Sequence, residues 1–74
     1  MENIKLKTEF IKLDQLLKFG GLTGSGGEAK MLIADGFVRL NGEVCTMRGK
    51  KIYPGDEVTV EAPEHGISAS WRIS

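Results

Sequence analysis

The stretch from Ser25 to Gly42 constrains the fold more than any other part of the chain, because it predicts a short capped helix that leads directly into a β-hairpin. Ser25 can accept a hydrogen bond from the backbone amide of Glu28, and the Glu28 carboxylate can accept one from the amide of Ser25, which is the pattern of a capping box. Three apolar side chains then fall on one helical face: Ala29, Leu32 and Ile33. That face must be covered by another element.

The end of this helix and the start of the hairpin are also marked in the sequence. Gly36 stands where a left-handed residue would end the helix, which limits the helix to about three turns. The apolar residues Phe37, Val38 and Leu40 begin an extended run. Asn41-Gly42, which follows, is the strongest short-range signal for a tight hairpin turn.

Upstream of this unit, apolar residues alternate with lysines over Glu2 to Thr8 and predict a strand. A first helix is expected over Glu9 to Phe19, with Thr8 as its cap and Gly20-Gly21 as its end. Two short helices joined by so brief a link must pack against each other, and a sheet has to close the core on one side. The buried side of the first helix would consist of Phe10, Leu13, Leu16 and Leu17.

Downstream, the sequence predicts a returning hairpin strand over residues 43–46, a strand at Val58–Val60 and a last strand at Ile67–Ile73. Pro54-Gly55 suits a type II turn, and His65-Gly66 suits a final hairpin. Trp71 is expected to anchor the core, since large aromatic side chains dominate small cores. We therefore expect an α+β fold, with two short packed helices against a small twisted, mostly antiparallel sheet, in one domain over residues 1–74.

Several classes of function lack the residues that they need. Cys45 is the only cysteine, and with His65 as the only histidine it leaves too few ligands for a structural zinc site. No nucleophile lies near a base in sequence, so no catalytic residues, metal or cofactor are expected and the protein is predicted not to be an enzyme. The chain has no apolar run of about 20 residues and no secretory signal, which favours a cytoplasmic protein without a membrane partner or small-molecule substrate.

Charge is distributed unevenly although the formal net charge is zero. Residues 30–53 contain five basic and two acidic residues, whereas residues 54–74 contain one basic and four acidic residues. A small domain with one basic face fits a nucleic-acid partner better than its total charge suggests. Arg39 is expected to lie opposite Glu43 across the hairpin, which favours a structural cross-strand pair for this one arginine.

Taken together, the spacing of these residues resembles the small RNA-binding domain named after small-subunit ribosomal protein four. The resemblance extends from Lys12 to Val60, about two thirds of the chain, and the overall length is similar to that of the short stand-alone bacterial members, some of which are ribosome-associated. The shared pattern consists of Lys12-Leu13-Asp14, Leu17, Gly21-Leu22, Ser25, Ala29-Lys30, Leu32-Ile33, Gly36, Val38, Asn41-Gly42, Pro54-Gly55-Asp56 and Val58.

The resemblance implies a helix pair of the alpha-L type packed on a small sheet, with RNA held across the helices and the hairpin. Lys12 matches a basic position at the start of the first helix, Ser25 matches the cap of the second, and Lys30 matches the basic residue that faces the groove. Arg39 or Arg48, together with Lys50, would extend this surface along the strands and the basic loop, and Lys51 is a further candidate for neutralising phosphates. Many members carry Arg directly after the capping Ser, where this chain has Gly26, and Lys lacks the bidentate fork of Arg.

The leading hypothesis is a non-catalytic, monomeric protein that binds structured ribosomal or transfer RNA through phosphate contacts and RNA shape. The alternative is a protein-interaction module that docks on a larger assembly through its sheet edge or its acidic C-terminal portion. A third, weaker hypothesis is an accessory domain whose catalytic partner is a separate chain.

Overall fold

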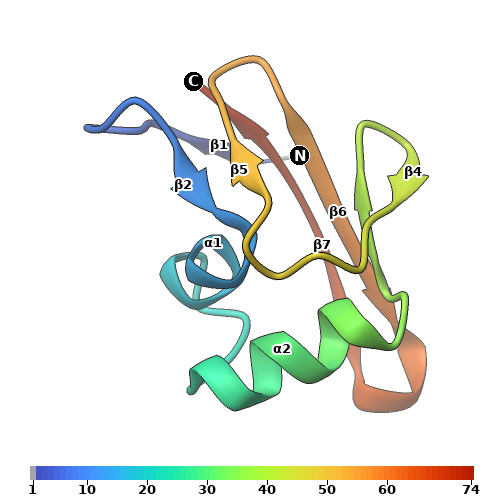
Figure 1. Cartoon of the computed structure of the whole chain (residues 1–74). Coiled ribbons are helices and arrows are strands. Elements are labelled where there is room, and N and C mark those ends of the chain that lie inside the picture. The colour runs from blue at the N-terminus through green and yellow to red at the C-terminus, as the bar shows by residue number, and fades with distance from the viewer. Residues whose placement is uncertain (1) are drawn as a thin grey trace.

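The computed structural model describes residues 2–74 and contains two helices, one 3₁₀ turn and seven strands over that range (Figure 1). In chain order the elements are β1 (Glu2–Ile4), β2 (Ile11–Lys12), α1 (Leu13–Phe19), α2 (Gly26–Ala34), β3 (Val38–Leu40), β4 (Glu43–Val44), β5 (Lys51–Ile52), β6 (Glu57–Ala62), η1 (Pro63–His65) and β7 (Ile67–Ile73).

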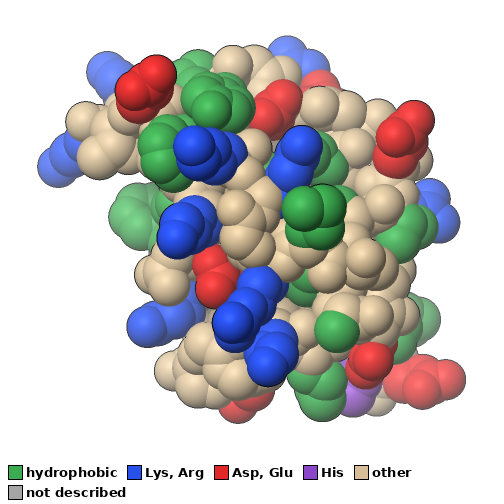
Figure 2. All heavy atoms as spheres, in the orientation of Figure 1, with side chains coloured by type: hydrophobic (Ala, Val, Ile, Leu, Met, Phe, Trp, Pro, Cys, Tyr) green, Lys and Arg blue, Asp and Glu red, His purple; other side chains and the backbone are tan. Residues whose placement is uncertain are grey.

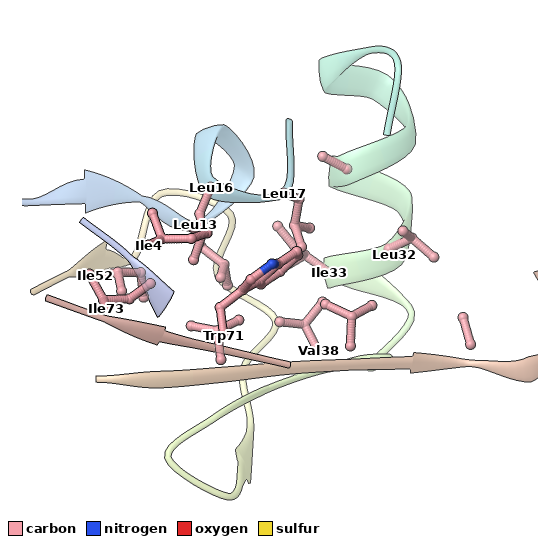
Figure 3. Close-up of a cluster of buried hydrophobic side chains, with 14 residues drawn as sticks. Ile4, Leu13, Leu16, Leu17, Leu32, Ile33, Val38, Ile52, Trp71 and Ile73 are labelled. Carbon is pink, nitrogen blue, oxygen red and sulfur yellow. The ribbon is translucent and has the colours of Figure 1, made fainter. Parts of the chain in front are cut away.

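Five strands form the main sheet in the order β1-β7-β6-β3-β4, and β2 and β5 form a separate antiparallel ribbon. Within the main sheet, β1 runs parallel to β7, with Glu2 opposite Trp71, and the other neighbours are antiparallel. The helices pack against each other on one face of this sheet (Figures 1 and 3). The predicted α+β class, with a helix pair against a mostly antiparallel sheet, is confirmed.

Trp71 lies at the centre of the core, as predicted, between the sheet and the helix pair (Figure 3). It is 2% exposed, and its indole ring fits directly against the backbone of Gly20, the residue that follows α1. A Cβ added at Gly20 would lie only 2.5 Å from Cζ2 of Trp71. The close approach of ring and backbone therefore requires glycine at this position, although the φ angle of Gly20 (−73°) suits any residue.

The second helix and its cap agree with the sequence. The amide of Glu28 donates to Oγ of Ser25 at 3.3 Å, and the predicted apolar face is buried. The return bond differs from the expected capping box, because Oε2 of Glu28 accepts from the amide of Gly24, at 3.4 Å, rather than from Ser25. Gly36 adopts φ +82° and closes the helix, with its amide bonded to the carbonyl of Ile33.

The predicted start of the first helix is wrong. Helix α1 begins at Leu13 rather than at Glu9, and Phe10 is only half-buried. The hydroxyl of Thr8 does not cap a helix, since it donates to the carbonyl of Phe10. The predicted strand over Glu2 to Thr8 is likewise shortened to β1, in which Ile4 is buried. Residues 11 and 12 pair instead with β5, so a tertiary contact overrides a helical pattern.

The hairpin turn is confirmed, with Asn41 at φ +52° and Gly42 at +87°. Its strands are shorter than expected, since β4 ends at Val44. The expected Arg39–Glu43 pair is also wrong: a two-residue turn places Glu43 opposite Leu40, and Arg39 lies opposite Val44. The other predicted turns are present, with φ +100° at Gly55 and a left-handed Gly66 between β6 and β7.

Candidate nucleic-acid interface

The ribbon formed by β2 and β5 brings two lysines together from opposite halves of the chain. Ile11 lies opposite Ile52, and Lys12 lies opposite Lys51. Because successive side chains of a strand point to opposite faces, the isoleucines share one face of the ribbon and the lysines share the other. Ile52 is fully buried, whereas Lys12 and Lys51 are exposed. The ribbon therefore attaches to the core by its apolar face and presents two cations to solvent.

The segment just before β5 is fixed against the start of α1. The amide of Leu13 donates to the carbonyl of Lys50 at 2.9 Å, and the amide of Asp14 donates to the carbonyl of Arg48 at 3.1 Å. These bonds satisfy helix N-terminal amides that a capping side chain would otherwise serve, and Lys12, the residue at the cap position, makes no side-chain cap bond. The same bonds hold Arg48 and Lys50 beside the lysines of the ribbon.

Four of the six predicted site residues are thus placed next to one another, and we call Lys12, Arg48, Lys50 and Lys51 the ribbon cluster. All four side chains are exposed. Figure 2 shows Lys and Arg side chains in a band down this face, from the area of the ribbon to that of α2, with an acidic side chain among them. Within residues 2–74 the ion pair that the structure records, Arg72 with Glu57, involves none of the cluster.

The remaining two predicted residues, Ser25 and Lys30, belong to α2. Lys30 is exposed and lies next to the buried Ala29 in the helix, so its stem begins at the edge of the apolar face. The hydroxyl of Ser25 is already engaged as acceptor for the amide of Glu28. The carboxylate of Glu28 lies close by, on the amide of Gly24. Ser25 therefore contributes to the surface mainly by fixing where α2 begins.

The opposed lysines of the ribbon carry a cost in stability that can be measured. Like charges directly across a strand pair are destabilising, and a cation beside a helix N-terminus is unfavourable. In Lys12→Glu, the interaction with Lys51 and the interaction with the helix N-terminus both become favourable. We expect the free energy of unfolding to rise by only about 0.5–1 kcal/mol, since positions 12 and 51 are both exposed. Urea unfolding of Lys12→Glu tests this expectation. Lys18→Glu, which reverses the charge of an exposed lysine in the last turn of α1, is measured for comparison. A loss of stability in Lys12→Glu alone would contradict the opposition of the lysines.

Two aromatic residues of this face escaped the sequence interpretation. Phe10, which the sequence pattern placed in a helix, and Tyr53, to which it gave no role, adjoin the paired residues Ile11 and Ile52 at what we call the outer end of the ribbon. Their ring centroids lie 5.9 Å apart, and Nζ of Lys51 lies 4.9 Å from the centroid of the Phe10 ring. The signal available in the sequence was the inverted symmetry of Phe10-Ile11-Lys12 and Lys51-Ile52-Tyr53, in which Ile11 pairs with Ile52 and Lys12 pairs with Lys51.

The described residues also limit other kinds of site. Among residues 2–74 there is no group of three or more His, Cys, Asp or Glu side chains that could hold a metal ion. Over the same part of the chain, neither helix has the length and apolar character needed to cross a membrane.

A helix pair on one face of a small sheet, joined to an exposed cationic ribbon, defines a small α+β domain with a basic surface. Residues 4–68 match the S4 domain, and the chain belongs to this family. Its membership confirms the resemblance drawn from the sequence pattern.

Curated relatives are of similar size. RlbA of Bacillus subtilis (strain 168), named as a probable ribosome maturation protein, is 41% identical over 58 residues, which is 78% of this chain and 82% of the relative. YbcJ of Escherichia coli (strain K12), named as a putative RNA-binding protein, is 40% identical over 53 residues, or 72% of this chain and 76% of the relative.

Proposed function

We propose that this protein binds structured RNA, ribosomal or transfer RNA, as a non-catalytic monomer in the cytoplasm and takes part in ribosome maturation or function. Its contacts would be phosphates and the shape of the duplex, since the base edges of A-form RNA lie in a deep, narrow groove that side chains cannot read. The family match and the names of the relatives support this proposal.

The observation that carries the proposal is the ribbon cluster. Backbone hydrogen bonds from α1 and the pairing of β2 with β5 bring the backbones of these four basic residues together, and all four side chains are exposed. Holding like charges together lowers stability, and a polyanion is the partner that would relieve the repulsion. Lys30 on α2 would extend this surface, and Ser25 would position it.

Sequencing of RNA crosslinked to the protein in cells tests the proposal. We expect enrichment of a discrete site in ribosomal or transfer RNA, and loss of that enrichment in a variant with Lys50→Glu and Lys51→Glu. Purified protein should bind the recovered RNA with an affinity that falls steeply with salt, because phosphate contacts release counterions.

The opposite result would favour the alternative. Background crosslinking for both proteins, together with salt-insensitive binding to a protein partner, would indicate a protein-interaction module. The exposed edge strand β4, where Val44 is 55% exposed and Met47 just beyond it 65% exposed, would then be the surface to map.

Gly26, the first residue of α2, offers a gain-of-function test. A Cβ added there meets nothing within 4 Å, so a side chain can begin at this position without displacing its neighbours. For Gly26→Arg we expect a several-fold gain in RNA affinity and a salt slope steeper by about 0.7–0.9, the value of one added phosphate contact. Stability should change little, because removal of a helical glycine gains about 1 kcal/mol and a cation at the helix start loses about 0.3–1 kcal/mol.

Gly26→Gln is the matched control, because it fills the same space without a charge. Equal affinities for the two variants, measured by fluorescence anisotropy over a range of salt concentrations, would exclude Gly26 from the RNA-binding surface.

A further inference from the structure

The outer end of the β2–β5 ribbon has a composition unlike that of the rest of the basic face. Extending the pairing of Ile11 with Ile52 by one residue places Phe10 opposite Tyr53. Since side chains alternate between faces, these aromatic residues lie on the same face of the ribbon as Lys12 and Lys51. In Figure 2, hydrophobic side chains gather next to Lys and Arg side chains at the upper left of the face, where Figure 1 places this end of the ribbon.

Tyr53 is the accessible member of this aromatic pair. It is 43% exposed, whereas Phe10 is half-buried and is approached by Nζ of Lys51 at 4.9 Å from the ring centroid. The two rings are tilted by 46° and lie 5.9 Å apart, so Phe10 supports Tyr53 from one side. With 43% of the residue exposed, Tyr53 still presents surface to solvent beside Phe10.

The backbone of Tyr53 is held in place by the turn that follows it. Its amide donates to Oδ2 of Asp56 at 2.9 Å, and its carbonyl accepts from the amide of Asp56 at 3.1 Å. Gly55 supplies the positive φ that this turn requires. Because its backbone is already fixed, Tyr53 loses no backbone entropy when a ligand stacks on its ring.

We propose that Tyr53, supported by Phe10, is a stacking platform for an unpaired RNA base next to the duplex held by the ribbon cluster. This inference rests on the proposed function and extends it, because the protein would then recognise the junction of a duplex with a single-stranded segment. Aromatic side chains bind unpaired bases by stacking, and neighbouring cations neutralise the phosphates on either side. Lys12 and Lys51 lie next to the aromatic pair on the same face, two residues further along each strand of the ribbon.

The experiment compares two RNA probes, a blunt-ended hairpin and the same hairpin with a short single-stranded tail that contains 2-aminopurine. The wild-type protein should bind the tailed probe more tightly and quench the 2-aminopurine fluorescence. Tyr53→Ala should lose about five- to a hundredfold in affinity for the tailed probe, together with the quenching, and should bind the blunt probe as the wild type does. Tyr53→Phe should retain both properties, because its ring is preserved.

Phe19→Ala is the matched control, since Phe19 is a more exposed aromatic residue (68%) at the end of α1. It should behave as the wild type does, and thermal unfolding of every variant checks the fold. Equal binding of the two probes, or unchanged quenching with Tyr53→Ala, would overturn the stacking platform while leaving the proposed function intact. No binding of either probe at low salt would instead contradict the proposed function itself.

Discussion

Replacement of Lys50 and Lys51 together by glutamate is expected to lower the affinity for structured RNA on the order of a hundredfold at about 0.1 M salt. Each phosphate contact contributes close to a factor of ten at that salt concentration through counterion release, and reversal of the charge adds repulsion. Both side chains are exposed, so the fold should be retained. Anisotropy titrations at several salt concentrations would measure the affinity and a decrease in slope of about two.

The matched control for this variant has Lys5→Glu and Lys7→Glu, which changes the net charge by the same amount. Both lysines are exposed and lie between β1 and β2, outside the ribbon cluster. If RNA binding depends on where the charges lie, the control should lose much less affinity. Equal losses in the two variants would mean that RNA responds only to the total charge of the protein, and the ribbon cluster would no longer be a defined surface.

The contact between Gly20 and Trp71 predicts the largest effect on stability. Gly20→Ala should lower the free energy of unfolding by about 1–3 kcal/mol, because its Cβ would overlap the indole ring. This is a large share of the total for a domain of this size, on the order of 0.1 kcal/mol per residue. Urea unfolding would measure the change, with Gly24→Ala as control, since a Cβ at Gly24 meets nothing within 4 Å.

A double-mutant cycle separates this overlap from other effects of alanine. Trp71→Phe removes the indole atoms that the added Cβ would approach, Cζ2, Cε2 and Cη2. The change Gly20→Ala should therefore cost far less in the Trp71→Phe background than in the wild type, with a coupling of at least about 1 kcal/mol. Additive effects would show that the cost arises elsewhere, for example in the backbone where α1 ends.

The second helix and the hairpin could be predicted because their signals are local. Ser25 accepts a hydrogen bond from an amide three residues away, Gly36 ends the helix, and Asn41-Gly42 sets its own turn. Each of these features depends on residues within one turn, so the tertiary structure had little opportunity to alter it. The error over Arg39 was one of register, since the correctly predicted Asn41-Gly42 turn places Leu40, and not Arg39, opposite Glu43.

The ribbon could not be predicted, because its strands contain two residues each and show no alternation of their own. The spacing of Phe10 and Leu13 also fits the apolar face of a helix. The helix begins only at Leu13 because the carbonyl groups of Lys50 and Arg48, far along the chain, accept hydrogen bonds from the amides of Leu13 and Asp14. The basic character of residues 30–53 was visible in the sequence. The neighbours of each lysine were not visible in the sequence. Those neighbours create the opposed lysine pair and the proposed aromatic platform.

The parallel pairing of β1 with β7 has a consequence for how the molecule folds. Ile4 lies opposite Ile73, and both side chains belong to the core, so these contacts join segments that are far apart in the sequence. Contacts of such long range require the loss of loop-closure entropy before any stabilising interaction forms. This slows folding relative to a helical domain of equal length. During synthesis the core cannot close until residues 71–73 have left the exit tunnel. The proposed RNA-binding surface, which is attached to this core through Ile52, would therefore be complete only after β7 has been synthesised.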